Sequence, residues 1–287
     1  MASLKEVKNR IASVKSTRKI TSAMKMVASS KLHHAQQAIE QMRPYEHRLG
    51  RIMATFVSSL DGDISSPYAV EREVRRVALV VFTSNSSLCG GFNGNVIKML
   101  RSTLHDYEQR GIQVVKVYPI GKKAADALRK LGSEPADYSA VLDHPAYDPV
   151  AAIAQEIMDL FSAEEIDAAE IIYHHFKSSA TQILRKEQFL PVVLKTDEGS
   201  AADASNYIVE PSAQHLVSKL IPRALHLQVY TALLDSLASE HAARVIAMQV
   251  ATDNADELLS ELTLQYNKTR QQAITAELLD IVGGSMQ

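Results

Sequence analysis

Both ends of this 287-residue chain carry apolar residues that recur three and four positions apart over very long stretches. The first stripe runs through Leu4, Val7, Ile11, Val14, Arg18, Thr21, Lys25, Ala28, Leu32, Ala35, Ile39 and Met42, and the second through Leu227, Tyr230, Leu234, Leu237, His241, Arg244, Met248, Ala251, Ala255, Leu258, Leu262, Gln265, Thr269, Gln272, Ala276 and Leu279. A stripe that repeats every seven residues packs one helix along another as a coiled coil. The pattern predicts that the two ends form a rod together and that the middle of the chain forms a compact body.

Both predicted helices carry boundary signals. Ser3 is a good N-cap and Glu6 completes a capping box, so the first helix is predicted over residues 3–59. Pro44 lies inside this stretch and should kink the helix without ending it. The last helix is predicted from about Ser212 to residue 282, where a Gly-Gly pair stops it.

The middle of the chain alternates between strand and helix patterns. The apolar run at residues 77–82 is typical of a strand buried on both faces. Further strands are predicted at residues 114–118, 170–176 and 188–194, helices at 96–109, 122–131 and 149–161, and a polar loop at 195–206. This order predicts a small Rossmann-like parallel sheet covered by helices. The predicted fold class is therefore α/β plus a long coiled coil, with domains at residues 1–60, 61–210 and 211–287.

Charge is distributed unevenly along the chain. Residues 1–53 hold eleven Lys and Arg but three acids, whereas the remainder holds 20 basic and 30 acidic residues. A helix with one sign of charge is suited to an acidic protein surface, a nucleic acid or an anionic lipid. The single cysteine, Cys89, fits a reducing compartment, and we expect a bacterial cytoplasmic location.

Several residues invite a chemical interpretation, but each has a simpler structural one. The loop at residues 88–95 lies between a strand and a helix, yet it lacks the glycine spacing of a phosphate-binding fingerprint. The adjacent pairs His33–His34 and His174–His175 point to different faces of their elements, so neither pair can chelate a metal alone. Cys89 has no histidine nearby in sequence to activate it. The sequence therefore predicts no catalytic constellation, no metal and no cofactor.

The polar interruptions of the first stripe, Arg18, Thr21 and Lys25, have two possible explanations. Polar residues in a coiled-coil seam can specify register. Alternatively, the partner helix diverges at this point and these side chains meet a third protein.

Three motifs carry a resemblance to a known family. Residues 11–28 (IASVKSTRKITSAMKMVA), 262–284 (LTLQYNKTRQQAITAELLDIVGG) and 88–93 (LCGGFN) resemble the amino-terminal, carboxyl-terminal and central signatures of the gamma subunit of F-type ATP synthases. The resemblance covers the full length. It departs at Asn85-Ser86-Ser87, where the family commonly has an acidic-basic pair followed by glycine.

The resemblance implies a rotary motor part. The terminal helices would form an antiparallel coiled coil, a shaft that turns inside a ring of three alpha and three beta subunits and couples proton flow to ATP synthesis or hydrolysis. The body would contact the epsilon subunit and the c-ring, at the cytoplasmic face of the bacterial inner membrane, with membrane association only through the complex. The chain would not be an enzyme by itself and would bind no nucleic acid.

The resemblance also implies contact residues. Met24 and Lys25 match the place where the first helix meets an acidic loop of beta, and nearby basic residues give that contact a charge rationale. The expected partner contacts are Lys15, Arg18, Lys19, Met24, Lys25, Arg244, Arg270, Gln271 and Thr275.

Two other function classes stay open from the residues alone. One is a protein that binds nucleic acid or a membrane surface through its basic first helix, although that helix has no aromatic residues from Leu4 to Met42 to stack on bases. The other is a small nucleotide-binding enzyme, which the missing phosphate fingerprint argues against.

Overall fold

A computed structural model of the chain describes residues 3–59, 66–192, 210 and 212–284. The contacts group the chain into two compact units. We call residues 1–30 and 244–287 the terminal unit and residues 31–243 the body unit. The division into three domains at residues 60 and 210 follows the order of the elements and stays a prediction.

Two long helices dominate the chain, α1 (Leu4–Ser59) and α6 (Ala213–Gly284). The predicted capping box starts α1, because the Ser3 amide donates to Glu6 Oε2 at 2.9 Å and the Glu6 amide donates to Ser3 Oγ at 3.3 Å. The Ser212 hydroxyl accepts the His215 amide at the start of α6. α1 continues through Pro44, as expected, and α6 continues through Pro222.

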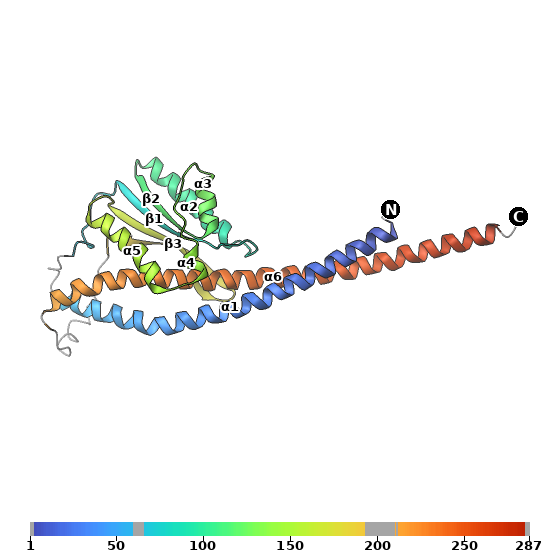
Figure 1. Cartoon of the computed structure of the whole chain (residues 1–287), viewed down its shortest axis with the longest axis horizontal. Coiled ribbons are helices and arrows are strands. Elements are labelled where there is room, and N and C mark those ends of the chain that lie inside the picture. Colours follow the sequence, from blue (N-terminus) through green and yellow to red (C-terminus); the bar gives the residue numbers. More distant parts are fainter. Residues whose placement is uncertain (1–2, 60–65, 193–209, 211, 285–287) are drawn as a thin grey trace. The chain divides into compact units, whose positions relative to one another are not determined.

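The body unit holds a four-stranded sheet in the order β2-β1-β3-β4 (Figure 1). The strands are β1 (Arg76–Phe82), β2 (Gln113–Ile120), β3 (Ala168–Ser178) and β4 (Thr181–Leu190). β1 pairs in parallel with both β2 and β3, as the sequence predicts. β4 is antiparallel to β3, so the expectation of a wholly parallel sheet is wrong for this strand. A short turn after Ser178 brings the chain straight back, which leaves no room for a crossover helix.

Helices cover both faces of the sheet. On one face, β1 residues such as Leu79 pack against α2 (Phe92–Gln109) and α3 (Lys122–Arg129). On the other face, residues such as Val80 and Phe82 pack against α5 (Tyr147–Ser162) and the body part of α6. A single turn, α4 (Ala140–Asp143), was not predicted. Burial on both faces explains the continuous apolar run of β1.

A polar contact fixes the start of β1, and a steric constraint lies at its end. At its start, the Asp167 carboxylate accepts the Arg75 and Arg76 amides at 3.1 and 2.8 Å and the Arg76 guanidinium at 3.0 Å. Burial pushes the pKa of Asp167 upward, but these hydrogen bonds outweigh burial and hold it below its usual value. At its end, Gly121 has φ 118°, and a Cβ there would lie 2.3 Å from the Thr83 carbonyl oxygen. The chain therefore requires glycine where β2 meets α3.

The remaining boundaries differ in detail from those predicted. β4 begins and ends earlier than the predicted strand at residues 188–194, because its exposed, charged residues hide the strand pattern. The predicted polar loop at residues 195–206 lies outside the described residues.

Candidate functional site

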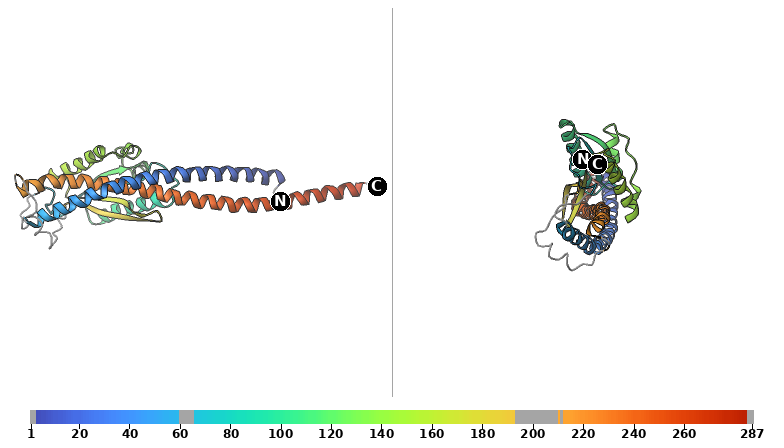
Figure 2. Two further views of the ribbon diagram at one scale, coloured as in Figure 1. Left: turned by 90° about the horizontal axis from the view of Figure 1, so that it is seen from below. Right: turned by 90° about the vertical axis from the view of Figure 1, so that its left-hand side faces the viewer.

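In the terminal unit, α1 and α6 lie side by side and run in opposite directions (Figure 2). Arg18 contacts Asp256, Thr21 contacts Thr252 and Lys25 contacts Gln249, so rising numbers in α1 meet falling numbers in α6. The antiparallel coiled coil expected from the family resemblance is therefore confirmed within this unit.

The seam between these helices follows a seven-residue repeat on both sides. Val7, Thr21 and Ala28 are buried in α1, and Met248, Ala255 and Leu262 are buried in α6. Positions separated by seven residues return to the same helix face, so this spacing keeps one continuous stripe against the partner helix.

The polar interruptions in the seam are paired with polar residues of α6. The Thr21 and Thr252 hydroxyl oxygens lie 2.8 Å apart, and Lys25 Nζ donates to Gln249 Oε1. Arg18 Nε lies 2.5 Å from Asp256 Oδ1, with both side chains about half exposed. These contacts favour the register explanation over divergence of the two helices at this point.

The side of α1 that faces away from the seam is both basic and apolar. Ile20, Met26 and Val27 are large apolar residues that are 57%, 66% and 59% exposed. Lys15 and Lys19 are exposed close to them. Residues 4–30 of α1 hold seven basic residues and the single acid Glu6. We call this surface the basic-apolar face.

Near the carboxyl-terminal end of α6, residues 270–279, 281 and 282 are all exposed. In each of the three polar pairs, the residue number in α1 and the residue number in α6 add to almost the same value. Extending this antiparallel register places Leu4, the first residue of α1, opposite roughly residue 270 of α6. Figure 2 shows α6 continuing past the start of α1. Beyond that point Ile274, Leu278, Leu279, Ile281 and Val282 are all exposed. Large exposed apolar side chains gathered in one place mark an interaction surface.

The predicted contact residues fall into three groups. Lys15, Arg18, Lys19, Arg270, Gln271 and Thr275 are exposed, Met24 and Lys25 are half-buried, and Arg244 is buried. Arg18, Thr21 and Lys25 contact α6. Their partners there are residues that the sequence analysis did not single out, namely Asp256, Thr252 and Gln249. Pairing the two stripes in antiparallel order would have drawn attention to them.

The glycine-containing loop of the body unit is held by its own side chains. Asn93 Oδ1 accepts the Ser84 amide at 2.9 Å, and Asn93 Nδ2 donates to Cys89 Sγ at 3.1 Å. Cys89 is buried. Asn85, at the departure from the family pattern, donates to the Ser139 carbonyl oxygen at 3.0 Å and accepts the Lys122 amide at 3.1 Å. These residues connect the loop to its neighbours.

The two adjacent histidines of β3 face opposite sides of the sheet. His174 stacks on Phe92 of α2, with ring centroids 4.5 Å apart, and burial lowers its pKa to about 4. His175 Nδ1 lies 2.5 Å from Asp235 Oδ2 of α6. Among the described residues, no group of three or more His, Cys, Asp or Glu side chains could hold a metal ion.

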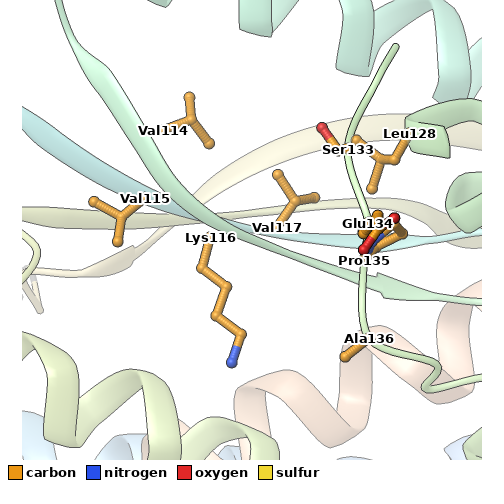
Figure 3. A pocket seen from close by; sticks show the side chains of 9 residues that line it. All are labelled: Val114, Val115, Lys116, Val117, Leu128, Ser133, Glu134, Pro135 and Ala136. Atoms are coloured by element: carbon orange, nitrogen blue, oxygen red, sulfur yellow. The ribbon is translucent and has the colours of Figure 1, made fainter. Parts of the chain in front are cut away.

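A pocket of about 220 Å³ lies beside the edge strand β2 (Figure 3). It is lined mainly by strand residues such as Val115 and Val117 and by the segment around Pro135. The Lys116 amine, its one basic group, is paired with Glu156 Oε1 at 2.5 Å.

No helix in the described ranges combines the length and the apolar character needed to cross a lipid bilayer.

Comparison with known proteins gives one consistent result. A family model described as ATP synthase matches residues 3–286. The ATP synthase gamma chain of Bacteroides fragilis is 57% identical over 290 residues, with both chains fully covered, and that of Flavobacterium johnsoniae is 47% identical over 99% of this chain and 98% of its own.

Solved structures share the fold at low sequence identity. A chain of the Euglena gracilis mitochondrial ATP synthase, from a structure of OSCP, F1 and the c-ring in rotational state 3, has a TM-score of 0.66 at 20% identity and covers 99% of this chain and 93% of its own. A chain from the central stalk and c-ring of the Tetrahymena thermophila enzyme has a TM-score of 0.58 at 24% identity, covering 81% and 99%. Together with the full-length sequence matches, the antiparallel terminal helices and the mixed sheet place this chain in the ATP synthase gamma chain family.

Proposed function

We propose that this chain acts as the central rotor shaft of an ATP synthase through two surfaces of the terminal unit, the basic-apolar face and the exposed end of α6. In this role the shaft turns with proton flow across the membrane, and its rotation drives ATP synthesis in the alpha3beta3 ring. The observation that carries the proposal is the exposure of large apolar side chains along these surfaces of a helical pair.

Charge and exposure suit a contact that must break and form again at each step. The basic residues around Lys15 and Lys19 attract an acidic loop of a beta subunit over a Debye length of about 8 Å. Exposed ion pairs contribute only about 0–1 kcal/mol each, so a beta subunit can release one face of the shaft and bind the next.

Conformational coupling follows from the asymmetry of the terminal unit. Its α1 side is strongly basic, whereas residues 244–284 of α6 hold six acids and three basic residues. A beta subunit that binds one face better in one conformation is shifted toward that conformation when the face arrives. The chain needs no reactive group for this work and makes or breaks no bond itself.

Family membership supports a proposal for the remaining partners. We propose that the body unit contacts the epsilon subunit and the c-ring, and that the complex holds the chain at the cytoplasmic face of a bacterial inner membrane. The gamma chains of Bacteroides and Flavobacterium species support a bacterial enzyme.

A matched pair of substitutions tests the basic-apolar face. Val27→Asp places a carboxylate on this face, and Val70→Asp makes the same change at an exposed valine of the body unit. Assembled complexes in inverted membrane vesicles are assayed for ATP hydrolysis and for ATP-driven proton pumping.

We expect Val27→Asp to lower proton pumping per ATP hydrolysed, because the new charge must lose water at every contact, while Val70→Asp leaves this ratio unchanged. Equal behaviour of the two variants would contradict the assignment of the face. Failure of the unmodified chain to co-purify with alpha and beta subunits would contradict the shaft itself.

A further inference from the structure

Residues 213–243 of α6, its part in the body unit, pack against apolar side chains on two sides. Residues 232–240 are buried without interruption. One side packs against the sheet and α5 through Val229, Leu233 and Leu237, and another packs against α1 and β3 through Leu234, Ala238 and Ala242. Apolar attraction has no direction, so such contacts tolerate small rotations and slides of the helix.

Four of the residues in this buried stretch are polar, Asp235, Ser236, Ser239 and Glu240, and two of them, Asp235 and Ser239, contact β3. Asp235 Oδ2 lies 2.5 Å from His175 Nδ1, and the Ser239 hydroxyl donates to the His174 carbonyl oxygen at 3.2 Å. Asp235 and Ser239 are four residues apart and therefore lie one above the other on the same side of α6. They contact two consecutive residues of one strand.

Two contacts one helical turn apart fix more than one contact can. A single contact leaves the helix free to pivot about it, whereas two define both the rotation of α6 about its axis and its position along the axis. A slip by one residue turns each side chain by about 100° and moves it by about 1.5 Å, which removes both contacts. Such a slip leaves the Asp235 carboxylate, only 5% exposed, buried without its partner, which strongly penalises the wrong register.

The surroundings of this pair are polar and incompletely filled. A cavity of about 190 Å³ borders it and is lined by groups from all three neighbouring elements, including Arg43 of α1 and Tyr173, Arg185 and Glu187 of the sheet. Thr231 Oγ1 of α6, in the same lining, is buried and has no hydrogen-bond partner within the described part of the chain. Burial raises the pKa of Asp235, and His175, Arg43 and Arg185 oppose that rise. The pair of Asp235 and His175 therefore lies beside a space that apolar side chains do not fill.

We propose that Asp235 and Ser239, through His175 and the His174 carbonyl, are the positioning residues that fix the rotational register of α6 against the sheet. This inference rests on the proposed function, in which torque applied to the body must pass to α6 without slip. The apolar core holds α6 against the sheet, and the polar contacts set the rotation of α6 about its own axis relative to the sheet.

A double-mutant cycle on the full chain tests the pair independently of any rotary role. Asp235→Asn, His175→Gln and the double variant are unfolded in urea. We expect each single change to raise the unfolding equilibrium constant at least tenfold, with a coupling of about tenfold between the two sites. The control is the exposed pair Asp106 and Arg110, 3.5 Å apart, where Asp106→Asn should change the constant less than threefold. Additive effects at positions 175 and 235 would overturn the inference.

A functional readout separates positioning from simple stability. In assembled complexes we expect Asp235→Asn to lower proton pumping per ATP hydrolysed at least threefold while ATP hydrolysis changes less than twofold. The exchanged variant, His175→Asp with Asp235→His, keeps the pair and should therefore restore the ratio of protons pumped to ATP hydrolysed. If the single variants fail to fold, the exchanged variant still tests the pair.

An unchanged pumping ratio in a folded variant whose cycle shows a broken pair would refute the positioning role. Failure of the unmodified chain to support pumping would instead refute the proposed function and leave the cycle result intact.

Discussion

Thr21 and Thr252 allow a covalent test of the paired terminal helices. Their hydroxyl oxygens lie 2.8 Å apart, and a disulfide bond needs its sulfurs at about 2.05 Å. Small side-chain rotations close this difference, so the double variant Thr21→Cys with Thr252→Cys should form a disulfide under mild oxidation. The native Cys89 is buried and should not compete for either thiol.

The stabilisation from this bond can be worked out from the sequence separation. The two positions are 231 residues apart, and the chain-entropy relation for a loop of that size gives about 5 kcal/mol. Engineered bonds usually deliver less, because they distort the native geometry, so we expect the free energy of unfolding to rise by roughly 2–4 kcal/mol. Reduction should remove the whole gain.

The control moves one thiol along the seam. Thr21→Cys with Ala255→Cys keeps the second position within the buried stripe but shifts it three residues, a rise of about 4.5 Å. Cross-linking is followed by non-reducing electrophoresis and by mass spectrometry of the linked peptides. The Thr252 pair should link at least tenfold faster than the Ala255 pair, and the reverse order would refute the register.

The same bond tests how the helices move during function. Because both helices belong to one rotor, the oxidised enzyme should synthesise ATP at the rate of the reduced enzyme. Inhibition that appears on oxidation and disappears on reduction would show that α1 and α6 slide past each other, which contradicts a shaft that turns as one piece.

Three further substitutions test the body unit by urea unfolding. Asp167→Asn should lower the free energy of unfolding by about 2–4 kcal/mol at pH 7. Because folding lowers the pKa of Asp167, its carboxylate stabilises the folded chain above the unfolded pKa of about 4, and this stabilisation is lost as the pH falls through the folded pKa. The difference in stability between the variant and the native chain should therefore shrink in acid. Leu233→Ala, at a fully buried position between α6 and the sheet, should cost about 2–5 kcal/mol, and a cost below 1 would contradict the packing. Gly121→Ala should destabilise by about 1–3 kcal/mol because its Cβ meets the Thr83 carbonyl, whereas Gly94→Ala, with open space around it in α2, should be neutral or stabilising by up to about 1 kcal/mol.

The long helices and the first three strands could be predicted because their signals are local. Ser3 and Glu6 mark the start of α1 within four residues, and the apolar run of β1 needs no knowledge of its neighbours. β4 gives a weaker signal, since it lies at the sheet edge and carries charged residues. Lys186 of this strand is paired with Glu170 across the sheet at 3.3 Å, which only the folded chain reveals.

The candidate site was predictable as a surface but not as a set of pairs. The basic stretch and the polar interruptions are visible in the sequence, yet the partner of Arg18 lies 238 positions away at Asp256 and depends on the register of two long helices. The contact between His175 and Asp235 likewise joins a strand to a helix 60 residues later. Sequence spacing carries no information about such pairs until the topology is known.

The two kinds of polar pair on α6 differ in energy in the way a rotor requires. The half-exposed pair of Arg18 and Asp256 contributes about 0–1 kcal/mol, so it can bias the register of the seam and, in the role that we propose, still exchange partners with a passing subunit. Replacing His175 should cost about 3–5 kcal/mol, because it leaves the Asp235 carboxylate, only 5% exposed, buried without its partner. A shaft needs weak contacts where it meets a changing surface and costly ones where torque enters it. Substitutions at the half-exposed pair of Arg18 and Asp256 should therefore affect coupling with little loss of stability, whereas those at the pair of His175 and Asp235 should affect both.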